Sequence, residues 1–198
     1  MWDENYDRPD YLFGTEPNAF LKRSASYFRA GQTALAIADG EGRNGVWLAR
    51  QGLKVTSMDL SAVGLEKARR LAERHNVTLD LVQGDVTTWD WPKDQFDIVV
   101  AIFVQFAAPP LRDEMFVRMR EAARPGGLIL VEGYRPAQIL NGTGGPSQID
   151  QLYTANLLRT AFADCEILLL EDYDADLDEG ERHKGPSALI DLIARRPA

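Results

Sequence analysis

Short apolar segments recur along the chain, separated by stretches in which polar residues, glycine and proline gather. A strand covered on both faces of a parallel sheet is apolar along its whole length, so such segments predict buried parallel strands. Five segments fit this description. They span residues 33–38, 53–58, 78–82, 96–103 and 128–132.

Segments with helical periodicity lie between several of these strands. Ser61 is a good helix-capping residue, and apolar residues follow it with the spacing that brings side chains to one helix face. A second helix is expected to begin at residues 109–110, where two prolines can open it, and to end before the turn-forming sequence RPGG at residues 124–127. A third helix is expected over residues 151–162.

The C-terminal part has a different pattern. Two apolar segments, residues 165–173 and 187–195, are joined by the acidic sequence DADLDEGERHKGP, which predicts an antiparallel hairpin. Strands that alternate with helices predict a parallel sheet with right-handed crossovers. We therefore expect an α/β fold with a doubly wound, mostly parallel seven-stranded sheet that ends in an antiparallel hairpin. Residues 1–198 are expected to form one domain, with residues 1–30 as an N-terminal helical extension and lid.

The charge balance argues against a polyanionic partner. The chain has 22 Lys and Arg residues against 30 Asp and Glu residues, a net charge of −8, whereas nucleic-acid-binding proteins usually carry a basic surface. Cys165 is the single cysteine, which excludes an intramolecular disulfide framework and fits a reducing compartment. No apolar run reaches the roughly 18 residues that span a bilayer. We expect a cytoplasmic protein that binds neither nucleic acid nor membranes.

The segment AIADGEGRNG, residues 36–45, contains the G-x-G-x-x-G spacing typical of a dinucleotide-binding loop. Two acidic residues, Asp39 and Glu41, stand in this loop. A carboxylate would repel a pyrophosphate, which binds bare backbone N–H groups at the positive end of a helix. It would attract the ammonium and sulfonium groups of S-adenosylmethionine (SAM), which has no phosphate. The loop therefore favours SAM over a nicotinamide dinucleotide.

Two further carboxylates follow the next two predicted strands. Asp59 lies 19 residues after Gly40, where it can accept hydrogen bonds from both hydroxyls of a ribose. Asp85 is placed to accept from the amino group of adenine, and Val86 offers its backbone N–H and an apolar wall. Because the carboxyl ends of parallel strands meet at one edge of a sheet, we expect Asp39, Asp59 and Asp85 around one crevice.

Taken in order, the segments AIADGEGRNG, VTSMDLS, GDVTTWDW, FDIVVAIF and RPGGLILVE resemble class I SAM-dependent methyltransferases over most of the chain. Three others, WDENYDRPDYLFGTEPNAFL, NGTGGP and DEGERHKGPSALIDLIARRP, resemble the small tellurite-resistance-type methyltransferases. The resemblance implies a Rossmann-like methyltransferase fold and SAM as the cofactor. The cofactor contacts that it implies are Asp39, Gly40, Gly42, Asp59, Leu60, Asp85, Val86, Ala101 and Phe103.

Two residues are candidates for a catalytic role. Tyr134 follows the fifth strand, beside the expected position of the methyl group, and His183 lies in the acidic segment expected to overhang the same rim. The resemblance supports His183. Many relatives have a histidine after the fourth strand where this chain has Gln105, which puts histidine chemistry at that point in doubt. We expect no metal site.

Several features narrow the methyl acceptor. FAAPPL follows the fourth strand where adenine N-methyltransferases show an Asn/Asp-Pro-Pro-aromatic motif, and no cysteine lies where a pyrimidine C5-methyltransferase needs its nucleophile. No added domain for holding RNA or protein is evident. We therefore expect methyl transfer to a small molecule: a thiol, a chalcogen oxyanion or a similar small nucleophile. A nucleophile that is already deprotonated needs alignment but no general base.

Three questions stay open at this level. The aromatic residues Trp2, Tyr6, Tyr11 and Phe13 can form a lid over the acceptor or simply cover the sheet. An NAD-dependent oxidoreductase remains an alternative, although a phosphate-binding loop and a proton donor are not evident. A SAM-binding protein without turnover is the other alternative, because methyl transfer leaves little catalytic signature in a sequence. The oligomeric state is not indicated.

Overall fold

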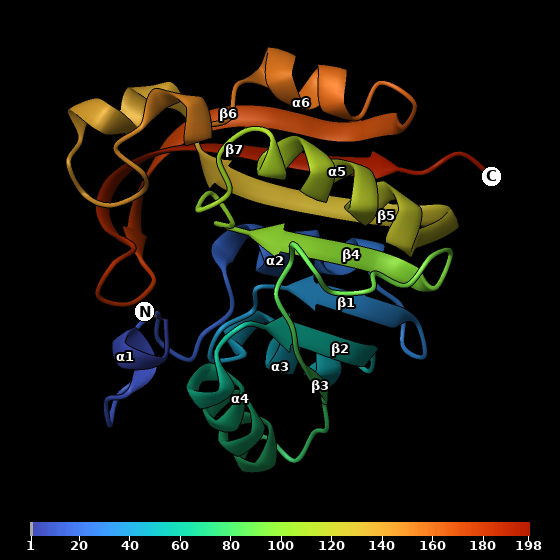
Figure 1. Ribbon diagram of the computed structural model, residues 1–198, viewed down its shortest axis with the longest axis vertical. Helices are drawn as coiled ribbons and strands as arrows, with labels where there is room; N and C mark the ends of the chain where they lie inside the picture. The colour runs from blue at the N-terminus through green and yellow to red at the C-terminus, as the bar shows by residue number, and fades with distance from the viewer. Residues whose placement is uncertain (1) are drawn as a thin grey trace.

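A seven-stranded sheet forms the centre of the molecule, as the computed structural model of residues 2–198 shows (Figure 1). The strand order is β3-β2-β1-β4-β5-β7-β6, and β7 alone runs antiparallel to its neighbours β5 and β6. The strands are β1 Thr33–Ile37, β2 Lys54–Asp59, β3 Asp80–Gln83, β4 Phe96–Ile102, β5 Ala123–Tyr134, β6 Glu166–Asp178 and β7 Lys184–Arg195. The predicted fold class, a mostly parallel, doubly wound sheet with a C-terminal hairpin, is confirmed.

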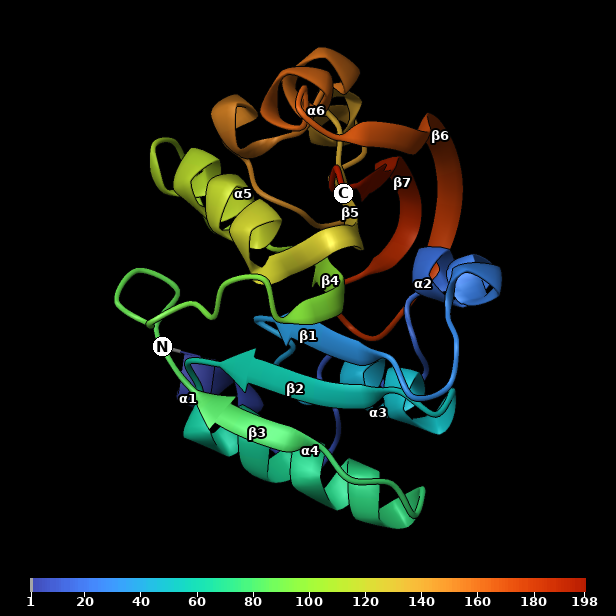
Figure 2. The same cartoon turned by 90° about the vertical axis from the view of Figure 1, so that its right-hand side faces the viewer.

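Helices cover both faces of this sheet (Figure 2). They are α1 Trp2–Tyr6, α2 Ala19–Arg23, α3 Arg43–Arg50, α4 Ala62–Arg74, α5 Leu111–Ala122 and α6 Ala155–Ala161, with 3₁₀ turns at Ser24–Tyr27, Pro136–Leu140 and Ile149–Gln151. Side chains alternate along β1: Leu35 and Ile37 join the core under α5 and α6, whereas Ala34 and Ala36 join the core under α2 and α3. This double burial explains why the parallel strands are continuously apolar.

Two of the three predicted helix starts agree with the structure, and the third helix begins later than expected. The Ser61 hydroxyl accepts a hydrogen bond from Gly64 N at 3.0 Å and caps α4. The helix predicted over residues 151–162 begins only at Ala155, because Thr154 caps it and Tyr153 N instead donates to Tyr134 O at 2.9 Å. Tyr153 is therefore held beside the end of β5 by this hydrogen bond.

The prediction of a turn at RPGG was wrong, because β5 begins at Ala123, directly after α5. Ala123 pairs with Phe96 of β4, Gly126 N donates to Arg196 O, and Arg196 N donates to Gly127 O. Backbone hydrogen bonds therefore draw this stretch into the sheet as an irregular part of the strand.

The acidic segment between the last two strands is mostly strand as well. β6 continues to Asp178 and β7 begins at Lys184, which leaves only residues 179–183 as the loop. Along the end of β6, Tyr173, Ala175 and Leu177 point inward, and the aspartates at 172, 174, 176 and 178 are exposed. The longer hairpin carries His183 to the carboxyl edge of the sheet. Among residues 2–198, no helix has the length and apolar character needed to cross a membrane.

Candidate active site

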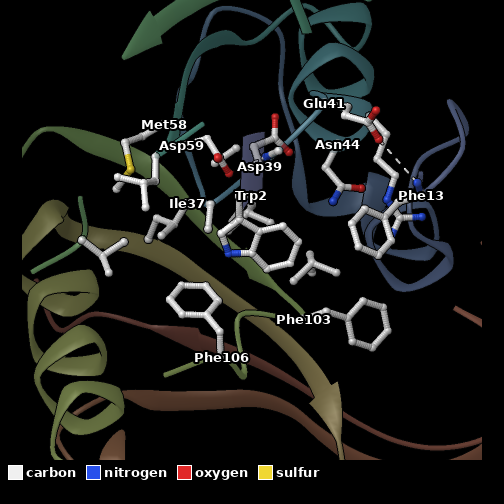
Figure 3. A pocket seen from close by; sticks show the side chains of 18 of the residues that line it. Trp2, Phe13, Ile37, Asp39, Glu41, Asn44, Met58, Asp59, Phe103 and Phe106 are labelled. Carbon is white, nitrogen blue, oxygen red and sulfur yellow. Dashed lines mark hydrogen bonds between the residues drawn. The ribbon is translucent and has the colours of Figure 1, made fainter. Parts of the chain in front are cut away.

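A cavity of about 290 Å³ opens at the carboxyl ends of β1, β2 and β4, the edge where doubly wound sheets bind their ligands. Figure 3 shows Asp39 and Asp59 on one side, Phe103 and Phe106 on the opposite side, and Trp2 between them. Seven of the nine cofactor contacts implied by the resemblance line this cavity. They are Asp39, Gly40, Asp59, Leu60, Asp85, Val86 and Phe103.

Asp39 follows β1, and neighbouring donors hold its carboxylate. Gly45 N donates to Oδ2 at 3.1 Å, and the Ser57 hydroxyl donates to the same oxygen at 2.8 Å. A Cβ at position 45 would clash with Oδ2, so the third glycine of the motif leaves room for this carboxylate. Burial raises the pKa of Asp39 to about 7. A cation brought by a ligand would therefore stabilise the ionised form.

Asp59 is the last residue of β2, and Asp85 lies just past the end of β3. Asp59 Oδ2 accepts from Gly40 N and Oδ1 accepts from Ser61 N, both at 2.8 Å, so the carboxylate is fixed at the cavity wall. Burial raises the pKa of Asp59. Asp85 Oδ1 accepts from the Thr87 hydroxyl at 2.7 Å and from Thr87 N at 2.8 Å, which lowers the pKa of Asp85. Both carboxylates retain lone pairs that a ligand can use.

Gly42 and Ala101 lie outside the lining of this cavity. A Cβ at Gly42 would clash with Ala68 of α4, so this glycine permits close packing of the loop against that helix. Ala101 belongs to the core beneath α5, and because side chains alternate along β4, its neighbours Val100 and Ile102 line the cavity instead. Both residues therefore contribute to packing, and their contact with the cofactor stays a prediction.

Glu41 has a different role from the one that the loop sequence predicted. Its Oε1 lies 2.5 Å from Lys67 Nζ, and its Oε2 accepts from Leu12 N at 2.7 Å. The carboxylate is therefore neutralised internally and ties the N-terminal segment to the glycine loop. The nearby guanidinium of Arg43 is likewise paired with Glu179, at 2.8 Å. The negative charge that favours a cationic cofactor is therefore that of Asp39 and not that of Glu41.

Aromatic residues from the N-terminal segment reach the cavity. Trp2, Tyr6 and Phe13 line it, and the rings of Trp2 and Tyr6 stack at a centroid distance of 5.5 Å. Tyr11 lies outside the lining, and its hydroxyl donates to Lys67 O at 3.0 Å. The segment therefore contributes both to the site and to packing on α4, and its closure over an acceptor stays a prediction.

Tyr134 and His183, the two catalytic candidates, are hydrogen-bonded to each other. The Tyr134 hydroxyl lies 2.6 Å from His183 Nδ1, and both residues line a second cavity of about 210 Å³ next to the first. Burial and the nearby Arg43 lower the pKa of His183 to about 3, so its imidazole is neutral at pH 7. Among residues 2–198, no hydrogen-bond partner is recorded for Nε2 of His183.

Gln105, at the position where the resemblance implies a histidine, is part of the framework. Its Nε2 donates to Tyr134 O at 2.8 Å and to Gln151 O at 2.9 Å, and its Oε1 accepts from Tyr134 N at 2.6 Å. The side-chain amide thus holds the end of β5 in place. The histidine of this site comes instead from the C-terminal hairpin.

Apolar side chains that the sequence analysis did not single out complete the first cavity. They are Ile37, Met58, Val100, Ile102, Phe106 and Leu111. Most of them lie at or near a strand end, so they could have been predicted from the positions of the strands. Phe106 follows β4 in a loop, where no periodicity indicated its direction.

Comparisons with known proteins agree with this architecture. A family model described as a methyltransferase domain matches residues 34–127. The demethylmenaquinone methyltransferase of Tropheryma whipplei (strain Twist) is 30% identical over 135 residues, which are 64% of this chain and 53% of that protein. The chain therefore spans about half the length of the curated relatives it matches.

Two solved structures share the fold. A protein solved in connection with the conversion of a disulfide bond into a thioacetal group during echinomycin biosynthesis has a TM-score of 0.80 and 17% identity, covering 99% of this chain and 90% of that chain. TehB from Haemophilus influenzae has a TM-score of 0.74 and 17% identity, covering 90% of this chain and 62% of that chain. At this level of identity the likeness shows the fold alone.

The sheet order with its antiparallel β7 defines a Rossmann-like methyltransferase fold. A cavity walled by Asp39, Asp59 and Asp85 fits a cationic nucleoside better than a pyrophosphate, because the nearby Arg43 is already paired. Residues 34–127 match a methyltransferase domain, and the chain as a whole shares the methyltransferase fold of the solved structures.

Proposed function

We propose that this protein transfers the methyl group of SAM to a small-molecule nucleophile. The observation that carries the proposal is the pair of adjoining cavities, which share Trp2, Phe103, Phe106 and His183 in their walls. One cavity carries the carboxylates suited to the cofactor, and the other offers a separate place for an acceptor. A protein that only binds SAM would not need this second place.

Three carboxylates would hold the cofactor. Asp39 would stabilise the cationic methionine portion, Asp59 would accept from the ribose hydroxyls, and Asp85 would accept from the adenine amino group. Leu60 and Val86 would supply apolar walls. A nicotinamide dinucleotide would place its pyrophosphate against these carboxylates, which is why an oxidoreductase is the weaker reading.

Methyl transfer requires little of the protein beyond alignment of the nucleophile with the methyl group. The nucleophile attacks the methyl carbon in line with the bond to sulfur, so orientation and exclusion of water supply much of the rate. His183 Nε2 would accept a hydrogen bond from the acceptor or donate one to it, with Tyr134 fixing the imidazole through Nδ1. A neutral imidazole also avoids repulsion from the cationic sulfonium. Its low pKa makes it a weak base, which favours an acceptor that ionises readily.

The N-terminal segment would act as a lid over the two cavities. Trp2 lies between the acidic and the aromatic walls of the first cavity (Figure 3), and it also lines the second cavity. Residues 1–30 are the proposed extent of the lid and its helical extension. A relative whose name gives demethylmenaquinone as its substrate supports a small-molecule acceptor for this chain.

A panel of acceptors tests the proposed function. The protein and labelled SAM would be incubated with one class of acceptor at a time. The classes are thiols, phenols, amines, chalcogen oxyanions, tRNA and peptides. We expect labelled product only with small molecules. Methylation of tRNA or peptide while every small molecule stays unlabelled would contradict the proposal, and binding of SAM without any product would favour a SAM-binding protein.

Asp39 should couple cofactor binding to proton release. Burial raises its pKa to about 7 in the free protein, from roughly 3.9 in an unfolded chain, so it stabilises the fold below pH 4 and this contribution is lost as the pH rises through 7. The ammonium group of the bound cofactor would lower this pKa. Calorimetry in buffers of different ionisation enthalpy should therefore show release of roughly half a proton at pH 7. Asp39→Asn should abolish the release, and an unchanged proton count in that variant would contradict the assignment.

A further inference from the structure

The second cavity is walled largely by rings. Phe103 stacks on His183 at a centroid distance of 4.2 Å and on Tyr134 at 4.8 Å. Trp2 and Phe106 form further parts of the wall. Phe106 is 43% exposed and stacks on no other ring among residues 2–198. An exposed aromatic face in a cavity wall is available to a flat ligand.

One of these rings, that of Phe103, belongs to a residue with a strained backbone conformation. Phe103 has a φ of 54°, in the left-handed region that bulky side chains rarely adopt. Its N–H donates to Glu132 O at 2.9 Å, which anchors the turn after β4. Because Phe103 leaves the alternation of β4, its ring reaches both cavities together with that of His183. Strain of this kind persists where the surrounding structure fixes a functional side chain.

No Asp, Glu, Lys or Arg side chain from residues 2–198 lines this second cavity. Arg43, which lines the first cavity, is paired with Glu179, and Arg182 is exposed, donates to Asn5 Oδ1 at 2.9 Å and lines neither cavity. The neighbouring first cavity holds the carboxylates. An anionic group in the second cavity would therefore find no cation and would be repelled across the shared wall.

The polar groups of the second cavity are few. The amide of Gln105 is committed to the backbone of Tyr134 and of Gln151. Nε2 of Gln151, which also lines the cavity, donates to Phe106 O at 3.2 Å. Nε2 of His183 and the hydroxyl of Tyr134 remain near the shared wall, where a reacting heteroatom would lie. This arrangement can recognise one heteroatom on an otherwise apolar molecule.

We propose that the second cavity binds a flat aromatic or conjugated acceptor whose only ionisable group is the heteroatom that receives the methyl group. The proposal rests on the methyltransferase function and narrows the acceptor classes expected from the sequence, since it disfavours chalcogen oxyanions. For a thiol, the proton leaves to solvent, the thiolate sulfur bonds the methyl carbon, and the carbon–sulfonium bond breaks with its electron pair staying on S-adenosylhomocysteine. The single negative charge is cancelled in this step, whereas a second anionic group would remain uncompensated.

The test compares two acceptors that share a ring and a thiol with each other and with a chalcogen oxyanion. Formation of S-adenosylhomocysteine would be measured with 4-chlorothiophenol, with 4-mercaptobenzoate and with tellurite. We expect kcat/KM to be at least about tenfold higher for 4-chlorothiophenol than for the other two. Gln151→Arg, which places a cation in the cavity wall, should raise the relative kcat/KM for 4-mercaptobenzoate by about tenfold. Gln148→Arg is the matched control, since Gln148 is exposed and outside both cavities, and it should leave the ratio unchanged.

Turnover of 4-mercaptobenzoate or tellurite at least as fast as that of 4-chlorothiophenol would overturn the proposal and leave the proposed function intact. If no acceptor yields S-adenosylhomocysteine, the protein does not methylate these compounds. A binding measurement then tests whether the cavity prefers an uncharged ligand. The methylated compounds 4-chlorothioanisole and 4-(methylthio)benzoate would be titrated into protein saturated with S-adenosylhomocysteine and followed by NMR. At least about tenfold tighter binding of the uncharged compound supports the proposal, and equal binding overturns it.

Discussion

Glu41→Ala is expected to lower the free energy of unfolding by about 3–5 kcal/mol, because it leaves a buried lysine without its carboxylate. Lys67 Nζ lies 2.5 Å from Glu41 Oε1, and both side chains are at least nine-tenths buried. The same substitution removes the acceptor of Leu12 N, so the N-terminal segment loses one of its hydrogen bonds to the glycine loop. Chemical denaturation followed by circular dichroism would measure the change.

Glu66→Ala is the matched control for this substitution. Glu66 lies one residue before Lys67 on the same helix, and its ion pair with Arg70, at 3.0 Å, is solvent-exposed. Exposed pairs of this kind contribute roughly 0–1 kcal/mol, so the control should change stability very little. Equal and small effects of both substitutions would show that the Glu41–Lys67 pair does not anchor the segment.

Asp59→Ala is expected to weaken cofactor binding by about ten- to a hundredfold, or ~1.5–3 kcal/mol. The substitution removes a charged acceptor for the ribose hydroxyls and also leaves Gly40 N and Ser61 N without their partner. Titration calorimetry with S-adenosylhomocysteine would measure the affinity, and circular dichroism would check that the fold is kept.

Two controls separate the effects of Asp59→Ala. Asp59→Asn keeps one oxygen as an acceptor and should lose less affinity than the alanine variant. Asp80→Ala removes an exposed carboxylate at the opposite end of the sheet, where it accepts from the Thr56 hydroxyl at 3.2 Å, and should leave affinity unchanged. An Asp59→Ala protein with native affinity would mean that the ribose lies elsewhere.

Local patterns were sufficient to predict the sheet and its acidic edge. Asp39, Asp59 and Asp85 each lie at or just past the end of an apolar run, and parallel strands must bring such residues to one edge. The cap at Ser61 was equally local. The end of β6 could also have been found, because its apolar and acidic residues alternate with the period of a strand.

Long-range pairing explains what the sequence did not show. Glu41 appeared to be a ligand-facing charge until its partner Lys67, distant along the chain, was in place. Likewise the Tyr134–His183 contact joins residues 49 positions apart. The direction of Phe103 depends on a left-handed backbone at the end of β4, which strand alternation does not predict.

Ligand-dependent stability tests the central claim, that the acidic cavity binds SAM, most directly. S-adenosylhomocysteine at a hundredfold its dissociation constant should raise the free energy of unfolding by ~2.7 kcal/mol. NADH at the same concentration should leave it unchanged, because its pyrophosphate would face the carboxylate of Asp39. Stabilisation by NADH, with none by S-adenosylhomocysteine, would contradict the account.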